Sequence, residues 1–105
     1  MKLLNIDYVP GKEIEPLDIV KGTVVHTKNV GRDFMAAMKT LVGGELIGYT
    51  QMLNEARQIA VKRMVDEAEA LGADAVINVR YGTSSVMSGA AEVIAYGTAV
   101  KFIEK

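Results

Sequence analysis

The sequence predicts an α+β fold, in which an antiparallel β-sheet carries a long helix and a shorter helix on one face. Residues 50–71 repeat apolar side chains at every third or fourth position, which is typical of an amphipathic helix. Segments near both ends of the chain are rich in β-branched residues, which is typical of strands. The predicted order is β-β-α-α-β-β, within one domain that spans residues 1–105.

The first two strands are expected before residue 30. Residues 3–7 form a short apolar segment, and Pro10 with Gly11 then predicts a turn. Residues 18–29 are rich in Val, Ile and Thr and predict a longer strand. Gly22 in the middle of this strand predicts either a bulge or the close approach of another backbone.

The two helices are expected in the middle of the chain. A short helix is predicted over residues 33–42, where Asp33 is a suitable N-cap. The long helix carries a stripe that should be buried in the core: Leu53, Ala56, Ala60, Met64, Ala68 and Leu71. No helix breaker separates Glu45 from this stripe, so we expect the long helix to begin before Thr50.

Two strands, over residues 74–81 and 92–103, are predicted to form a hairpin joined by the Ser- and Gly-rich residues 82–91. In the last strand small residues alternate with large ones, and we expect the helix to pack on the small side. In the preceding strand Ala75, Ile77, Val79 and Tyr81 are expected to share a face. Each strand thus presents apolar residues on both faces, which predicts a homo-oligomer, because monomers rarely expose large apolar patches. The alternative is that the short helix and the N-terminal arm cover the second face.

Composition excludes several classes of protein. A net charge of −1 and a pI near 5.8 argue against a nucleic-acid or anionic-membrane partner. The absence of cysteine excludes disulfides, thiolate zinc sites and cysteine nucleophiles. No run approaches the roughly 18 apolar residues of a spanning helix, and no export signal is visible, so a cytoplasmic protein is expected. Nothing in the sequence predicts a cofactor.

Few residues are candidates for a functional site. The glycine-rich segment before the long helix is either a helix–helix corner or a ligand site, because helix N-termini attract anions but P-loop spacing is absent. Glu55 and Arg57 lie on a face that is either solvated or turned to a partner, and Arg63 with Glu67 forms a possible i,i+4 ion pair. The candidate residues for ligand binding or assembly are therefore Gly43, Gly44, Glu45, Tyr49, Glu55 and Arg57. No residue is positioned to activate a serine nucleophile, so no catalytic residue is assigned and no enzymatic activity is predicted.

His26 is the one histidine of the chain. As a metal ligand it would need Asp18 or Asp33, or copies of itself from a symmetric assembly. The simpler interpretation is a surface or interface histidine, and no metal site is assigned.

Several short motifs together resemble the YbjQ-like family of small prokaryotic proteins. Each is weak alone, but their order and spacing are specific: Gly43-Gly44-Glu45 followed by Tyr49, then Glu55-Ala56-Arg57, Arg63-Met64, Leu71-Gly72-Ala73-Asp74-Ala75-Val76 and Tyr96-Gly97-Thr98-Ala99-Val100. The resemblance implies a dodecin-like subunit fold and a ring pentamer, so the expected partner is the chain itself, with an unknown small ligand. The family is commonly labelled as heavy-metal-binding. Without cysteine, such a site would need His26 and carboxylates shared between subunits.

Overall fold

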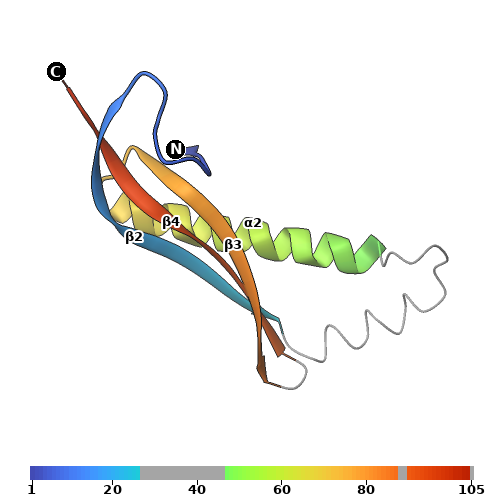
Figure 1. Ribbon diagram of the computed structural model, residues 1–105. Helices are drawn as coiled ribbons and strands as arrows, with labels where there is room; N and C mark the ends of the chain where they lie inside the picture. The colour runs from blue at the N-terminus through green and yellow to red at the C-terminus, as the bar shows by residue number, and fades with distance from the viewer. Residues whose placement is uncertain (27–46, 88–89, 105) are drawn as a thin grey trace.

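The computed structural model describes residues 1–26, 47–87 and 90–104, and its helix and strands are drawn in Figure 1. Over these residues the order is β1 (Lys2–Leu3), β2 (Glu13–His26), α2 (Ile47–Ala70), β3 (Ala75–Met87) and β4 (Ala90–Ile103). The α+β class is confirmed. The order β-β-α-α-β-β does not match, because the described part of the chain runs β-β-α-β-β. The short helix predicted over 33–42 lies outside the described residues.

The four strands form a mixed sheet in the order β1-β3-β4-β2. Strand β4 pairs antiparallel with both β2 and β3, as predicted. Strand β1 pairs parallel with β3, with Lys2 opposite Ala75 and Leu3 opposite Val76, so the sheet is mixed, whereas the sequence predicted an antiparallel sheet. A parallel pair needs a long connection, and here β2 and α2 both lie between the two strands in the sequence.

The strands are longer than the sequence predicted. Strand β2 begins at Glu13 and includes Pro16. An edge strand tolerates proline where the backbone N–H would point away from the neighbouring strand, because no hydrogen bond to that strand is then lost. The predicted loop over residues 82–91 is wrong, since β3 continues to Met87 and β4 begins at Ala90. Cross-strand pairing, such as Thr83 opposite Val93, outweighs the Ser- and Gly-rich composition of this segment.

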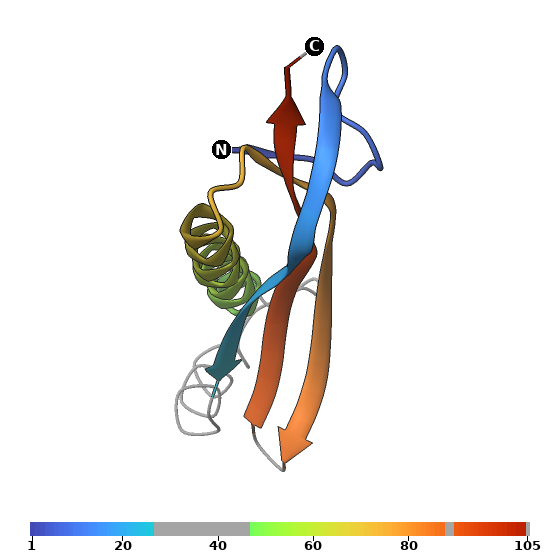
Figure 2. The same ribbon diagram turned by 90° about the vertical axis from the view of Figure 1, so that its left-hand side faces the viewer.

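Helix α2 packs on one face of the sheet only (Figure 2). It begins at Ile47, before Thr50 as predicted, and the chain leaves it through Gly72. The predicted stripe is confirmed for four of its members, which are fully buried against the small residues of β4: Ala56, Ala60, Met64 and Ala68. Leu71 is instead 45% exposed, because the helix ends at Ala70 and the next residue no longer follows the stripe. Within the described residues, no helix is long and apolar enough to cross a bilayer.

Gly22 is the point at which α2 lies directly on β2. A Cβ atom built on Gly22 would stand 1.9 Å from the Ala60 carbonyl oxygen and 2.5 Å from the Met64 nitrogen. Real Cβ atoms essentially never approach so closely, so only glycine fits while the helix keeps this position. The prediction of a close backbone approach at Gly22 is confirmed.

The opposite face of the sheet is covered at one end by the chain's own N-terminal arm, residues 4–12, which lies on the side away from α2 (Figure 2). Val9 packs there on Ala75, Ile77 and Val100, and Pro10 and Gly11 turn the chain into β2. The rest of this face carries no described element, and we call it the open face. Strand pairing assigns it Ile19, Lys21, Thr23 and Val25 of β2, Glu92, Ile94 and Tyr96 of β4, and Arg80, Gly82 and Ser84 of β3.

Candidate functional site

A bulge in β3 decides which side chains face α2. Between Ile77 and Arg80 the strand advances three residues while β4 advances two, from Thr98 to Tyr96. Asn78 takes the extra step with a φ of 54°. One extra residue reverses the face of the side chains that follow, as far as the next register shift between Ser85 and Met87. Tyr81 therefore pairs with Ala95, whose side chain belongs to the core beneath α2.

The bulge corrects the prediction that Ala75, Ile77, Val79 and Tyr81 share a face. Ala75 and Ile77 pack under the N-terminal arm, whereas Val79 packs against the core beneath α2. The arm holds the bulge in place, because the Val79 N–H donates to the Leu4 carbonyl at 2.9 Å and the Asn78 N–H to the Ile6 carbonyl at 3.0 Å.

Gly97 makes room for the bulge from the neighbouring strand. A Cβ atom at this position would lie 2.7 Å from Val76 Cγ1 and 2.9 Å from the Ile77 carbonyl oxygen. The sequence predicted that the helix packs on the small residues of this strand, which include Gly97. The structure shows that the close neighbour is β3, so the requirement for glycine comes from the sheet itself.

Tyr81 is the centre of the candidate site. It is 55% exposed and lines a groove of about 470 Å³ between α2 and β3, together with Asn54, Arg57, Gln58 and Val61. On its other side it lines a second hollow of about 390 Å³, formed with residues 3–5 and Val79. We call the first of these the α2–β3 groove. Its walls thus combine an aromatic ring, one aliphatic side chain and three polar side chains.

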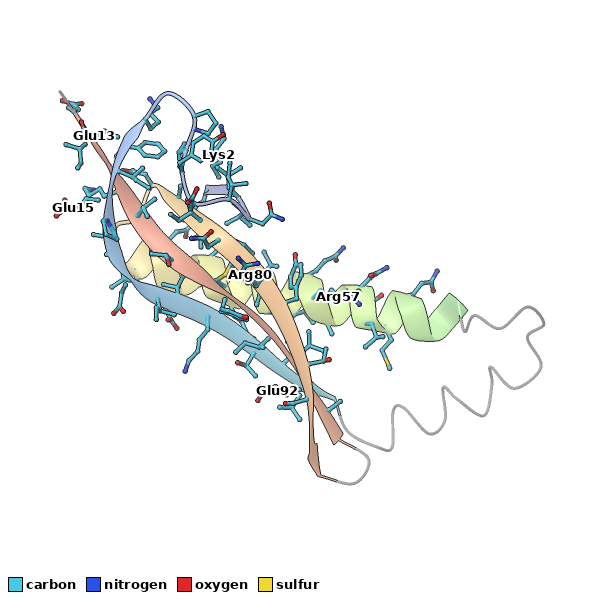
Figure 3. All side chains as sticks on the ribbon, viewed as in Figure 1. Lys2, Glu13, Glu15, Arg57, Arg80 and Glu92 are labelled. Carbon is cyan, nitrogen blue, oxygen red and sulfur yellow. The ribbon has the colours of Figure 1, made fainter. Side chains whose placement is uncertain are left out.

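Arg57 supplies the positive charge of the α2–β3 groove and projects from α2 in Figure 3. Its Nη1 donates to Asn54 Oδ1 at 2.6 Å, which holds the guanidinium at the groove. A guanidinium has five N–H donors, so most remain for a ligand. Arg57, the amides of Asn54 and Gln58, and the Tyr81 ring suit a small planar molecule with a carboxylate.

The structure brings only one of the predicted site residues to this groove. Arg57 lines it, whereas Glu55 is exposed on α2 and does not. Tyr49 lies in the first turn of α2. Gly43, Gly44 and Glu45 lie outside the described residues. From the sequence alone, Tyr81 was placed on a strand face and was not named among the candidate site residues. Asn78 was the available signal, since asparagine adopts a positive φ more readily than most residues.

A larger hollow, of about 810 Å³, lies at the end of the sheet near Phe102. Three of its charged side chains, those of Asp74, Lys101 and Lys12, already make contacts within the chain. Asp74 Oδ2 accepts the Phe102 N–H at 2.8 Å, and Lys101 Nζ donates to the Gly72 carbonyl at 3.1 Å. Lys12 Nζ lies 5.4 Å from the centre of the Phe102 ring. With these groups engaged, the α2–β3 groove is the better candidate for a ligand.

Metal-binding side chains do not converge in the described part of the chain. No group of three His, Cys, Asp or Glu residues there could hold an ion. His26 and Asp18 both lie in β2, where eight residues at about 3.3 Å each separate them by roughly 26 Å. These two residues of one subunit therefore cannot share a metal. Asp33, the other predicted partner, lies outside the described residues.

The chain is similar to bacterial proteins over its whole length. A UPF0145 protein of Clostridium novyi is 62% identical over 98% of this chain and 100% of its own. A UPF0145 protein of Thermotoga maritima is 59% identical over 96% of both. The crystal structure of a DUF74-family protein of unknown function from Pediococcus pentosaceus superposes with a TM-score of 0.69 over 98% of both chains, at 18% identity, and so shares the fold. The YbjQ family model, described as "Putative heavy-metal-binding", matches residues 1–103, and the chain belongs to this family.

Proposed function

We propose that this protein is a non-enzymatic binding protein that works as a homo-oligomer, with copies joined through the open face and a small ligand held in the α2–β3 groove on the other side of the sheet. Five copies is the number that the family resemblance implies. The cytoplasm is the compartment we expect, from the sequence. The observation that carries the proposal is the apolar surface left on the open face.

Three apolar side chains on the open face are exposed to solvent. Ile19 is 70% exposed, Val25 is 52% exposed and Tyr96 is 38% exposed. They lie on one continuous surface, because Tyr96 pairs with Lys21, between the other two residues on β2. An apolar patch of this kind with a polar rim marks an interaction surface.

A second copy of the chain is the partner that this surface fits best. Lys21 and Arg80 flank Tyr96 from the two neighbouring strands, and Glu92 lies nearer the β3–β4 hairpin end of the same face (Figure 3). The face therefore carries both signs of charge and can be complementary to another copy of itself. The subunit is also extended, with a radius of gyration of 17.0 Å against about 13 Å for a compact domain of this length.

The groove supports binding rather than catalysis. Its lining residues include a cation, two amides, an aromatic ring and an aliphatic side chain, but no nucleophile beside a base. A ligand with a planar ring and a carboxylate would stack on Tyr81 and accept hydrogen bonds from Arg57. We therefore propose this ligand class.

Assembly is tested by native mass spectrometry and analytical ultracentrifugation of untagged protein. We expect the wild-type protein to be an oligomer and Ile19→Asp to shift it toward single subunits. Ile59→Asp is the matched control, because Ile59 is 44% exposed on α2. A wild-type protein that sediments as one subunit at high concentration would overturn the assembly proposal, as would equal effects of the two variants.

Ligand binding is tested separately, by titrating benzoate as a probe and by searching the native mass spectrum for a co-purified small molecule. The variants Arg57→Ala and Tyr81→Phe are measured beside a control, Lys62→Ala, which removes an exposed cation that does not line the groove. Arg57→Ala should abolish binding, Tyr81→Phe should retain it because the ring remains, and Lys62→Ala should have no effect. Equal benzoate binding by all variants would show that the α2–β3 groove is not the binding site.

The family description favours a second candidate, a metal site made of His26 and carboxylates from different subunits. Elemental analysis of the purified protein and titration with zinc and copper test it. Submicromolar binding that disappears in His26→Ala would replace our proposal of an organic ligand, whereas binding that survives this substitution would exclude His26 as a ligand.

A further inference from the structure

The outer edge of β2 is occupied by side chains of the same subunit. Strand β2 is the last strand of the sheet, so alternate residues turn their backbone groups away from β4. The Lys21 N–H donates to Glu67 Oε1 at 3.4 Å, and Arg63 Nη1 donates to the Thr23 carbonyl at 2.5 Å. The Ile19 N–H donates to the carboxylate of the preceding Asp18 at 2.8 Å.

The close approach at Gly22 explains why helix side chains reach this edge. The α2 backbone lies against Gly22, at Ala60 and Met64, with Arg63 Cβ also within 2.8 Å of the position where a Cβ would stand. Arg63 and Glu67 are four residues apart, so both project from the same side of the helix. Their two backbone partners are Lys21 and Thr23, the residues on either side of Gly22.

Arg63 and Glu67 therefore do not form the i,i+4 ion pair that their spacing suggested. Among the residues that the structure describes, the ion pair on α2 joins Lys62 and Asp66 instead, at 3.0 Å. Arg63 and Glu67 each form a hydrogen bond to the backbone of β2. These bonds link the helix to the strand and do not stabilise the helix alone.

We infer that Arg63 and Glu67 close the outer edge of β2 to strand addition, and that the strand they exclude is β2 of a second copy. An exposed edge is a ready template for another strand, and proteins commonly protect such edges with charged side chains. β2 is 14 residues long, and another copy carries the same outward-facing backbone groups, so without these side chains two copies could pair antiparallel. Arg63 and Glu67 thereby prevent association of subunits through this edge, whichever face of the sheet the copies use to assemble.

The test compares two double variants that each remove one cation and one anion four residues apart on α2. Arg63→Ala with Glu67→Ala opens the edge, and Lys62→Ala with Asp66→Ala is the matched control. Light scattering coupled to size exclusion and thioflavin T fluorescence are measured over a range of protein concentrations. We expect the first variant to form species larger than the wild-type state, with a several-fold rise in fluorescence, and the control to match wild type.

A third substitution distinguishes strand addition from a general loss of surface charge. Lys21→Pro removes the outward N–H without interrupting the ladder to β4, and it should return the Arg63/Glu67 variant to the wild-type size. If that variant loses its helical circular dichroism, Arg63→Ala alone replaces it, since it removes the shorter contact. A folded variant that stays at the wild-type size would overturn the inference, and so would equal aggregation of the control. Each comparison holds whether the wild-type protein is one subunit or several.

Discussion

Replacing Gly22 by alanine tests the contact on which the arrangement of α2 depends. The new Cβ would stand 1.9 Å from the Ala60 carbonyl oxygen, and ordinary contacts begin at 3.4 Å, so the helix would have to retreat by about 1.5 Å. Overpacking costs about 1–3 kcal/mol when side chains can move aside. Here the two nearest atoms belong to the backbone of α2, so we expect the upper end, about 3 kcal/mol.

Thermal unfolding followed by circular dichroism measures this effect. About 3 kcal/mol corresponds to a fall in Tm of roughly 12 °C for a domain of about 100 residues. Gly82→Ala is the control, because its Cβ would meet only the tip of Ile94, Cγ2, at 3.1 Å. Alanine is otherwise favoured over glycine within a strand, so this change should alter stability by less than about 1 kcal/mol. Both variants are compared at equal protomer concentration. If the Gly22→Ala protein had the same Tm as the wild type, the direct contact between the α2 backbone and Gly22 of β2 would be refuted.

Other substitutions test the core, the bulge and the helix surface. Met64→Ala should cost about 2–5 kcal/mol in chemical denaturation because Met64 is fully buried, whereas Leu71→Ala should change stability by less than about 1 kcal/mol because Leu71 is 45% exposed. Gly97→Ala should cost about 1–3 kcal/mol by crowding β3, and a neutral result would contradict the bulge geometry. The hydrogen bond from Lys62 to Asp66 raises the pKa of Lys62 above its ordinary value of 10.5, so the pair's contribution is present at neutral pH and is lost as pH rises through that raised pKa. Asp66→Asn should therefore reduce the loss of Tm in strongly alkaline solution.

The candidate site could be predicted only in part, because its position depends on one residue of the β3 register. Arg57 was found from its place on the long helix, which periodicity locates well. Tyr81 was assigned to the wrong face, because simple alternation from Ala75 puts it on the side away from α2. The extra residue at Asn78 reverses that assignment, and it is held by hydrogen bonds to the N-terminal arm, far away in the sequence.

Local patterns determined the class of fold and the buried stripe of α2, because helical periodicity and strand composition involve residues close together in the sequence. For Gly22 the sequence predicted either a bulge or a close approach, and the contact with Ala60 and Met64 of α2 decided between them. Only the tertiary structure decided the parallel pairing of β1, the length of the hairpin strands and the partners of Arg63 and Glu67. Those outcomes depend on which backbone groups a distant segment leaves unpaired, and a hydrogen bond between residues 40 or more positions apart leaves no periodic signal in the sequence.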